Sequence, residues 1–215
     1  MRTTGIILDF DGVVVDSIAA HFGAWDAAVR QIFGRPLGEP GSIATLGTRA
    51  IAGILAARFG DPSLAGSLVH AKERALADTH VPPLFPGARE FVAAAAARGI
   101  PMGIASNSWR RYVHATLARH ALEVSVVVCG DEVTRTKPHP DILWACSNAL
   151  GIEPRERAQM LAFDDAEHGL DAARSAWMRP VGVASLLDAD VLHRSGKCAF
   201  VVAGLAEALA LLEAE

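Results

Sequence analysis

The sequence has few lysines, few cysteines and no long apolar run, and each shortage argues against a class of protein. Lys72, Lys137 and Lys197 are its only lysines, and the net charge of −4 comes without any block of like charges. Neither a nucleic acid nor an anionic membrane is therefore expected as a partner. No apolar stretch approaches the roughly 20 residues that cross a bilayer as a helix. Nucleic-acid-binding and membrane-spanning proteins are thus not the predicted classes.

The three cysteines are scattered, odd in number and without the spacing of a metal site; they are Cys129, Cys146 and Cys198. Reduced thiols in a cytoplasmic protein explain them best. The chain passes from Met1 into an apolar strand within a few residues, which leaves no room for a signal peptide. We therefore expect a cytoplasmic location.

What the sequence does contain is enough apolar material for a real core. It has 215 residues, of which 51% are hydrophobic and 20% charged, as in one large globular domain or a core with a modest insertion. Residues 16–83 show helical periodicity and no convincing strand. Helices are predicted from Ser17, at 42–59 and at 62–78, and the prolines of 81–86 bar further helix.

Beyond this insertion, strands alternate with helices. Such alternation implies a parallel sheet with right-handed crossovers. The fold class is therefore predicted as α/β, with a Rossmann-like parallel sheet core at 1–15 and 84–215 and an inserted helical cap domain at 16–83. After the first strand, we expect strands at 100–105, 124–128, 160–163, 181–184 and 199–202, and helices at 87–98, 108–121, 138–150, 167–177 and 205–212.

The first strand ends in a pair of aspartates. An apolar run suited to a strand buried on both faces leads into Asp9, Asp11 and Gly12. The two carboxylates would lie about 7 Å apart along the backbone on the same side of the extended chain, and they would repel each other unless a cation or a proton intervenes. Gly12 lets the chain turn with positive φ. Alone, such a pair is equally typical of a polar loop.

Polar residues also follow other predicted strands. Ser106 comes after the second strand, Lys137 precedes the helix that starts at Pro138, and Asp164 and Asp165 follow the strand at 160–163. Alone, Lys137 would more often be a solvated residue, but ligands of open parallel sheets bind at the carboxyl ends of strands. Several carboxylates against one ammonium leave a surplus of negative charge. Mg²⁺, held by oxygen ligands, would neutralise that surplus and attract a phosphate.

The segment Asp-Phe-Asp-Gly-Val-Val-Val-Asp-Ser at 9–17 resembles the first motif of the haloacid dehalogenase superfamily, in its phosphatase and phosphomutase branch. With the downstream residues in the same order, the resemblance covers nearly the whole chain. It implies that Asp9 is the nucleophile that takes the phosphoryl group, while Asp11, with a raised pKa, is the general acid and base. Ser106 and Lys137 would hold the phosphoryl oxygens, and Lys137 would keep Asp9 ionised. The implied metal ligands are Asp9, Asp11, Asp165 and, directly or through water, Asp164.

The predicted cap resembles the small helical cap of the β-phosphoglucomutase-like group. His-Phe-Gly-Ala-Trp at 21–25 is similar to the cap entry of that group, and Leu-Gly-Thr-Arg at 46–49 matches the place of an arginine that faces the substrate. His21 on sequence alone is as typical of packing. The substrate-binding residues implied are Gly12, Asn107, Arg49 and His21. The sequence departs from the family pattern at Ala166, usually Ser or Thr, and at 176–177, where Ala-Trp replaces Ala-Gly.

We therefore expect an enzyme, a Mg²⁺-dependent phosphatase that hydrolyses a small phosphorylated metabolite through an aspartyl-phosphate. The substrate would be a sugar phosphate or a phosphoglycolate-like acid, and the protein a monomer or homodimer. A β-phosphoglucomutase-like phosphomutase is the main alternative, because it needs the same core with a cap that holds a second phosphate. A catalytically silent protein that binds a phosphorylated ligand is a weaker alternative.

Overall fold

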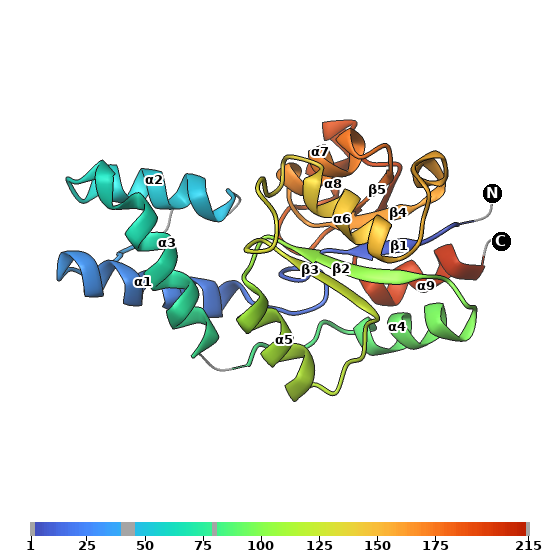
Figure 1. The fold of residues 1–215 in the computed structure, drawn as a ribbon, viewed down its shortest axis with the longest axis horizontal. Helices are drawn as coiled ribbons and strands as arrows, with labels where there is room; N and C mark the ends of the chain where they lie inside the picture. Colours follow the sequence, from blue (N-terminus) through green and yellow to red (C-terminus); the bar gives the residue numbers. More distant parts are fainter. Residues whose placement is uncertain (1–2, 40–45, 79–80, 214–215) are drawn as a thin grey trace.

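The protein is described by a computed structural model that covers residues 3–39, 46–78 and 81–213. Its centre is a six-stranded sheet in the order β3-β2-β1-β4-β5-β6, in which every neighbouring pair is parallel (Figure 1). The α/β prediction is confirmed. The strands are β1 (Ile6–Leu8), β2 (Met102–Ser106), β3 (Val126–Cys129), β4 (Leu161–Asp164), β5 (Arg179–Val183) and β6 (Phe200–Val202).

Helices cover both faces of this sheet. In Figure 1, α4 (Ala88–Ala97), α5 (Arg110–Arg119) and α9 (Leu205–Glu213) lie on one side. The other side carries α6 (Asp141–Ala149), α7 (Glu167–Ser175) and α8 (Ala189–Ser195).

Two apolar layers follow from this arrangement. Side chains alternate along a strand, so Ile6 and Leu8 join the layer under α4 and α9, whereas Ile7 joins the layer under α6 and α7. Burial of β1 on both faces explains its continuous apolar sequence.

The helices between β1 and α4 form a group of their own beside one end of the sheet (Figure 1). This helical group consists of α1 (Ile18–Phe33), α2 (Thr48–Arg58), the short 3₁₀ helix η2 (Pro62–Leu64) and α3 (Ala65–Ala77). It encloses a separate apolar cluster that includes Trp25, Val29, Leu55 and Leu68.

The chain leaves and re-enters the sheet region at neighbouring points. Val15 pairs with Leu84 in an isolated antiparallel bridge, and the Asp16 N–H donates to the Pro83 carbonyl at 2.9 Å. The predicted domain boundaries, 15/16 and 83/84, lie at these two neighbouring points, and the division into two domains stays a prediction.

Several element boundaries differ from the sequence-based expectation. The helix expected at 42–59 starts at Thr48 in the described chain, and 42–45 lie outside the described residues. The helix α8 and the 3₁₀ helix η3 (Pro154–Gln159) were not predicted, because short helices show too few turns for periodicity to reveal them. Among the helices of the described segments, none is long and apolar enough to cross a membrane.

Candidate active site

Polar side chains meet where β1, β2 and β4 end. These strands are neighbours in the sheet, so Asp9 after β1 and Asp164 at the end of β4 come close together at the same edge. The ammonium of Lys137 lies 2.7 Å from Asp9 Oδ1 and 2.7 Å from Asp164 Oδ2, and its side chain is 2% exposed. The sheet thus brings together residues that are up to 155 positions apart in the chain.

Three carboxylates form what we call the acidic trio: Asp9, Asp164 and Asp165, which each offer an oxygen within 4.8 Å of the others. Burial raises the pKa of Asp9 to about 7, with Lys137 opposing and the charges of Asp164 and Asp11 adding to the rise. Burial and the charges of Asp164 and Asp9 likewise raise the pKa of Asp165 well above its usual value. Burial thus opposes the ionised form of Asp9 that the resemblance implies, whereas Lys137 favours it.

This trio fits a hard divalent cation. Its ligand atoms are all carboxylate oxygens, which Mg²⁺ prefers, and a cation there would offset the burial and the repulsion that raise the two pKa values. The carboxylate of Asp11 is not part of the trio. Its predicted contact with the metal, through the backbone carbonyl, stays a prediction.

Two glycines let the backbone approach the trio closely. A Cβ on Gly12, whose φ is +82°, would lie 1.8 Å from Asp165 Oδ2, and one on Gly169 would lie 1.8 Å from the Asp164 carboxylate. The positive φ predicted for Gly12 is confirmed. Ser185, just after β5, donates hydrogen bonds to the Gly12 carbonyl and, at 3.3 Å, to Asp165. The chain around the trio is therefore packed without spare room.

Lys137 is fixed through its backbone as well as its side chain. Its N–H donates to Asn107 Oδ1 at 3.0 Å, and Asn107 Nδ2 donates to its carbonyl at 3.4 Å. Burial alone would lower the pKa of Lys137, but the charges of Asp164 and Asp9 outweigh burial and raise it. The ammonium therefore stays charged at neutral pH.

Asp11 turns toward the helical group rather than the trio. His21 Nε2 lies 3.0 Å from its Oδ1, Tyr112 Oη donates to Oδ1 at 3.1 Å, and Ser108 Oγ donates to Oδ2 at 2.7 Å. Burial would raise the pKa of Asp11, but the charge and hydrogen bond of His21 and the hydroxyls of Ser108 and Ser17 hold it below its usual range. The raised pKa expected from the sequence is wrong for this arrangement, because these donors favour the carboxylate.

Ser106 lies on the same edge. It is the last residue of β2 and is buried, and its Oγ accepts a hydrogen bond from the Ser108 N–H at 3.1 Å. The turn formed by Ser106, Asn107 and Ser108 lines the same cavity as Asp9 and Asp11. A ligand in that cavity would meet hydroxyl and amide donors from this turn.

The cavity has a volume of about 140 Å³ and lies between the sheet edge and the helical group. Gly12, His21 and Asn107 line it, as expected of substrate-binding residues. Arg49 does not: it is an exposed residue of α2, and its neighbours Gly47 and Thr48 line the cavity instead. The structure thus brings together every predicted site residue except Arg49.

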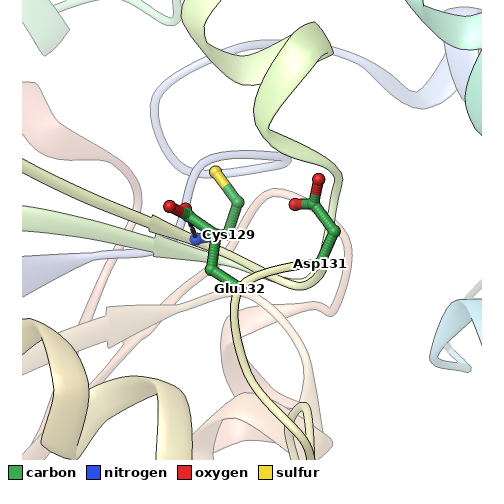
Figure 2. A group of neighbouring side chains, drawn as sticks. All are labelled: Cys129, Asp131 and Glu132. Carbon is green, nitrogen blue, oxygen red and sulfur yellow. Dashed lines mark hydrogen bonds between the residues drawn. The ribbon is translucent and has the colours of Figure 1, made fainter.

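A second group of possible metal ligands lies among the described residues, after β3: Cys129, Asp131 and Glu132 (Figure 2). Glu132 accepts a hydrogen bond from the Cys129 N–H at 2.9 Å and pairs with Arg110 at 2.7 Å, and Asp131 accepts from the Arg110 N–H at 2.9 Å. Burial and the charges of Glu132 and Asp131 raise the pKa of the Cys129 thiol, whereas a metal ligand would be a thiolate. We assign this group to the anchoring of α5.

Three residues that contact Asp11 or Asp165 were not predicted from the sequence. Ser185 follows the end of β5, so the strand-end rule that located Ser106 could have located it too. Tyr112 lies in the first turn of α5, and nothing in a single sequence shows that its hydroxyl reaches back to Asp11. Ser108 stands at the start of the helix predicted at 108–121 without a predicted role, and its hydroxyl donates to Asp11.

Comparison with known proteins is consistent with this geometry. Residues 3–176 match the sequence profile of the haloacid dehalogenase-like hydrolases. Phosphoglycolate phosphatase of Shigella boydii is 29% identical over 207 residues, which covers 83% of this chain and 80% of that protein. Fructose-1-phosphate phosphatase YqaB of Escherichia coli is 29% identical over 191 residues, which covers 85% of this chain and 97% of that protein.

Solved structures show the same fold. A hydrolase from Pseudomonas syringae superposes with a TM-score of 0.80 at 24% identity, and the alignment covers 99% of this chain and 98% of that one. At that level of identity the likeness establishes the architecture of the chain and leaves its substrate open.

Proposed function

The chain belongs to the haloacid dehalogenase-like hydrolase family, and from that membership we propose that it is a Mg²⁺-dependent phosphatase of a small phosphorylated metabolite. The relatives named phosphoglycolate phosphatase and fructose-1-phosphate phosphatase support a phosphomonoester as substrate. The observation that carries the proposal is the position of the Lys137 ammonium, 2.7 Å from both Asp9 and Asp164. A phosphoryl group placed beside Asp9 would meet this fixed positive charge.

Asp9 is the proposed nucleophile. Its carboxylate attacks phosphorus, a bond forms between Asp9 and phosphorus, and the bond from phosphorus to the leaving alcohol breaks. Water then attacks phosphorus and releases Asp9, so that one water molecule is consumed for each phosphate formed. Ser106 and Lys137 hold the phosphoryl oxygens, and Lys137 favours the ionised form of Asp9.

Asp11 is the proposed general acid and base. It would give its proton to the leaving alcohol and later accept one from water. His21, Ser108 and Ser17 hold the pKa of Asp11 low, so this role requires that some of these donors turn to the substrate when it binds. His21 belongs to α1, so a movement of the helical group would change exactly this contact.

The acidic trio is the proposed Mg²⁺ site, with the Asp11 carbonyl as a further ligand. When bound, the cation supplies charge neutralisation for the phosphoryl group. The helical group covers the cavity, which suits a small metabolite and limits the access of water and macromolecules. We also propose a cytoplasmic location, because Cys129, Cys146 and Cys198 are all free thiols.

The function is tested with Asp9→Asn. We expect the wild-type enzyme to release phosphate from p-nitrophenyl phosphate only when Mg²⁺ is present, and the variant to lose this activity while retaining its circular-dichroism spectrum. Asp190→Asn, at an exposed position of α8, is the matched control and should keep full activity. Full activity in Asp9→Asn would refute the nucleophile.

A separate assay distinguishes hydrolysis from phosphoryl transfer between sugar positions. Glucose 1-phosphate is supplied together with a hexose bisphosphate primer, and both inorganic phosphate and the isomeric sugar phosphate are measured. Release of phosphate supports the phosphatase, whereas net isomerisation without phosphate release would make the phosphomutase the better assignment.

A further inference from the structure

The side of the cavity opposite the acidic trio is apolar. Six large side chains from α1, α2 and the segments beside them line it, and we call them the apolar wall. They are Ile18, Phe22, Trp25, Leu37, Leu46 and Ile51.

Two members of the wall are exposed although they are large and apolar. Ile18 is 38% exposed and Leu46 is 40% exposed, and only two other large apolar side chains in the described chain are exposed to this degree. Both stand at the same cavity rather than at scattered places on the surface. Apolar surface kept open beside a phosphate site can gain free energy by covering an apolar part of a ligand.

Among the described residues, no cation other than the Lys137 ammonium lies at the cavity. No lysine or arginine is among the described residues that line it, and Arg49 is exposed outside the lining. The undescribed segment 40–45 reads Pro-Gly-Ser-Ile-Ala-Thr and cannot supply a charge. Lys137 is already paired with Asp9 and Asp164.

The two histidines that line the cavity do not supply a partner for a second anion. His21 lies 3.0 Å from Asp11 and is directed at that carboxylate, while His168 belongs to α7 on the sheet side of the cavity. The carboxylates of the acidic trio and Asp11 outnumber the positive charges of Lys137 and one divalent cation. No positive charge is therefore left to pair with an anion other than the phosphoryl group. A second anionic group would face apolar side chains and uncompensated carboxylates.

Resting on the proposed phosphatase function, we propose that the substrate is a monophosphate ester whose alcohol part is uncharged and places apolar surface against the apolar wall. Esters of hydroxy acids and bisphosphates are poor substrates, because their second anion finds no partner there. This narrows the substrate class away from phosphoglycolate-like acids and toward neutral alcohols or deoxygenated sugars.

A matched pair of esters tests the preference. Phenyl phosphate and 3-carboxyphenyl phosphate have the same scissile bond and differ by one carboxylate at the far end. We expect kcat/KM with Mg²⁺ to be about tenfold or more higher for the neutral ester, since like charges placed together are penalised. Equal or higher kcat/KM for the carboxylated ester would overturn this inference and leave the phosphatase intact. Hydrolysis of neither ester, nor of p-nitrophenyl phosphate, would instead overturn the proposed function.

Substitution of one residue of the apolar wall tests whether the wall causes the preference for the neutral ester. Leu46→Arg puts a cation at an exposed wall position, so it should fold normally and raise kcat/KM for the carboxylated ester about tenfold relative to the neutral ester. Ile54→Arg is the matched control, because Ile54 is 43% exposed on α2 and does not line the cavity. It should leave the ratio of the two esters unchanged. An unchanged ratio in Leu46→Arg, or an equal change in both variants, would show that the wall does not set the preference.

Discussion

The two sides of the cavity are built on opposite physical principles. The sheet side consists of charged and polar groups delivered by strand ends and fixed by hydrogen bonds, such as those that join Asn107 to the backbone of Lys137. The side formed by the helical group consists mainly of apolar side chains, two of which, Ile18 and Leu46, are exposed. The sheet edge holds charged groups in fixed places. The helical group packs on its own core, so its cavity-lining residues can be substituted without disturbing the sheet edge. The proposed chemistry and the choice of substrate are thus carried by separate parts of the chain.

The largest effect should come from removal of the buried Lys137 ammonium, which belongs to the sheet side of the cavity. Lys137→Met leaves the carboxylates of Asp9 and Asp164 without their ammonium, so we expect a loss of about 3 kcal/mol in the free energy of unfolding at pH 7 without metal. Phosphatase activity should fall by about 10³-fold. Urea denaturation and steady-state kinetics measure the two effects.

Lys197→Met is the control for the same chemical change at the surface. Lys197 pairs with Glu167 and Asp171 at 3.1 and 2.9 Å but is 25% exposed, so its loss should cost less than about 1 kcal/mol and leave activity unchanged. Similar costs for the two variants would mean that the charges on the sheet side are not specially organised.

The same contrast explains what the sequence could predict. Ser106 and Asp164 were found because parallel strands deliver their carboxyl ends to one edge, a rule that needs only strand positions. The contacts of Asp11 could not be found, because Tyr112 reaches it across 101 positions and His21 from another group of helices. The direction of its pKa was therefore wrong as well.

The helical group was harder to predict than the sheet edge. Its helices and apolar core follow from periodicity, which indicates a face and not a partner. Arg49, the arginine expected to face the substrate, lies on α2 next to the lining residue Thr48 but is itself outside the cavity lining. One residue along a helix turns a side chain by about 100°, which is enough to exclude it from a site.

Leu55→Ala tests whether the helical group is an independent unit. Leu55 is fully buried in its core, so truncation should cost about 3 kcal/mol. Hydrogen exchange should show faster exchange of amides in α1, α2 and α3 while β1 and β2 keep their protection. Ile54→Ala, next to it but exposed, should change little. An equal loss of protection in the sheet would contradict a separate unit.

Glu73→Gln tests a buried polar link between the helical group and the sheet side. Glu73 in α3 accepts hydrogen bonds from Lys72 Nζ at 2.8 Å and from the Trp109 N–H at 3.3 Å, and Trp109 belongs to the turn that follows Ser106. The variant keeps an oxygen but leaves the buried Lys72 without a counter-charge, so we expect a loss of about 2 kcal/mol. KM should rise more than kcat falls, because the helical group loses an anchor to that turn.

The double variant Lys72→Met/Glu73→Gln is its control. Removal of both charges should recover much of the stability lost in Glu73→Gln, because no unpaired charge then remains buried. A double variant less stable than Glu73→Gln would show that the apolar surroundings of the pair require the ammonium itself; they include Trp25, whose ring centroid lies 5.7 Å from Lys72 Nζ.

The smallest effect expected is the change in Tm when Mg²⁺ binds, and it belongs to the sheet side alone. Because the pKa of Asp9 is raised to about 7 and that of Asp165 is also raised, the folded protein binds more protons than the unfolded chain above about pH 4. The metal-free protein should therefore lose stability as the pH rises from about 4 to 7. Mg²⁺ needs the ionised carboxylates, so at ten times its dissociation constant it should raise Tm by about 3 °C at pH 8 and by much less at pH 5. Asp165→Asn should remove this difference, whereas equal shifts at the two pH values would contradict a metal site formed by the acidic trio.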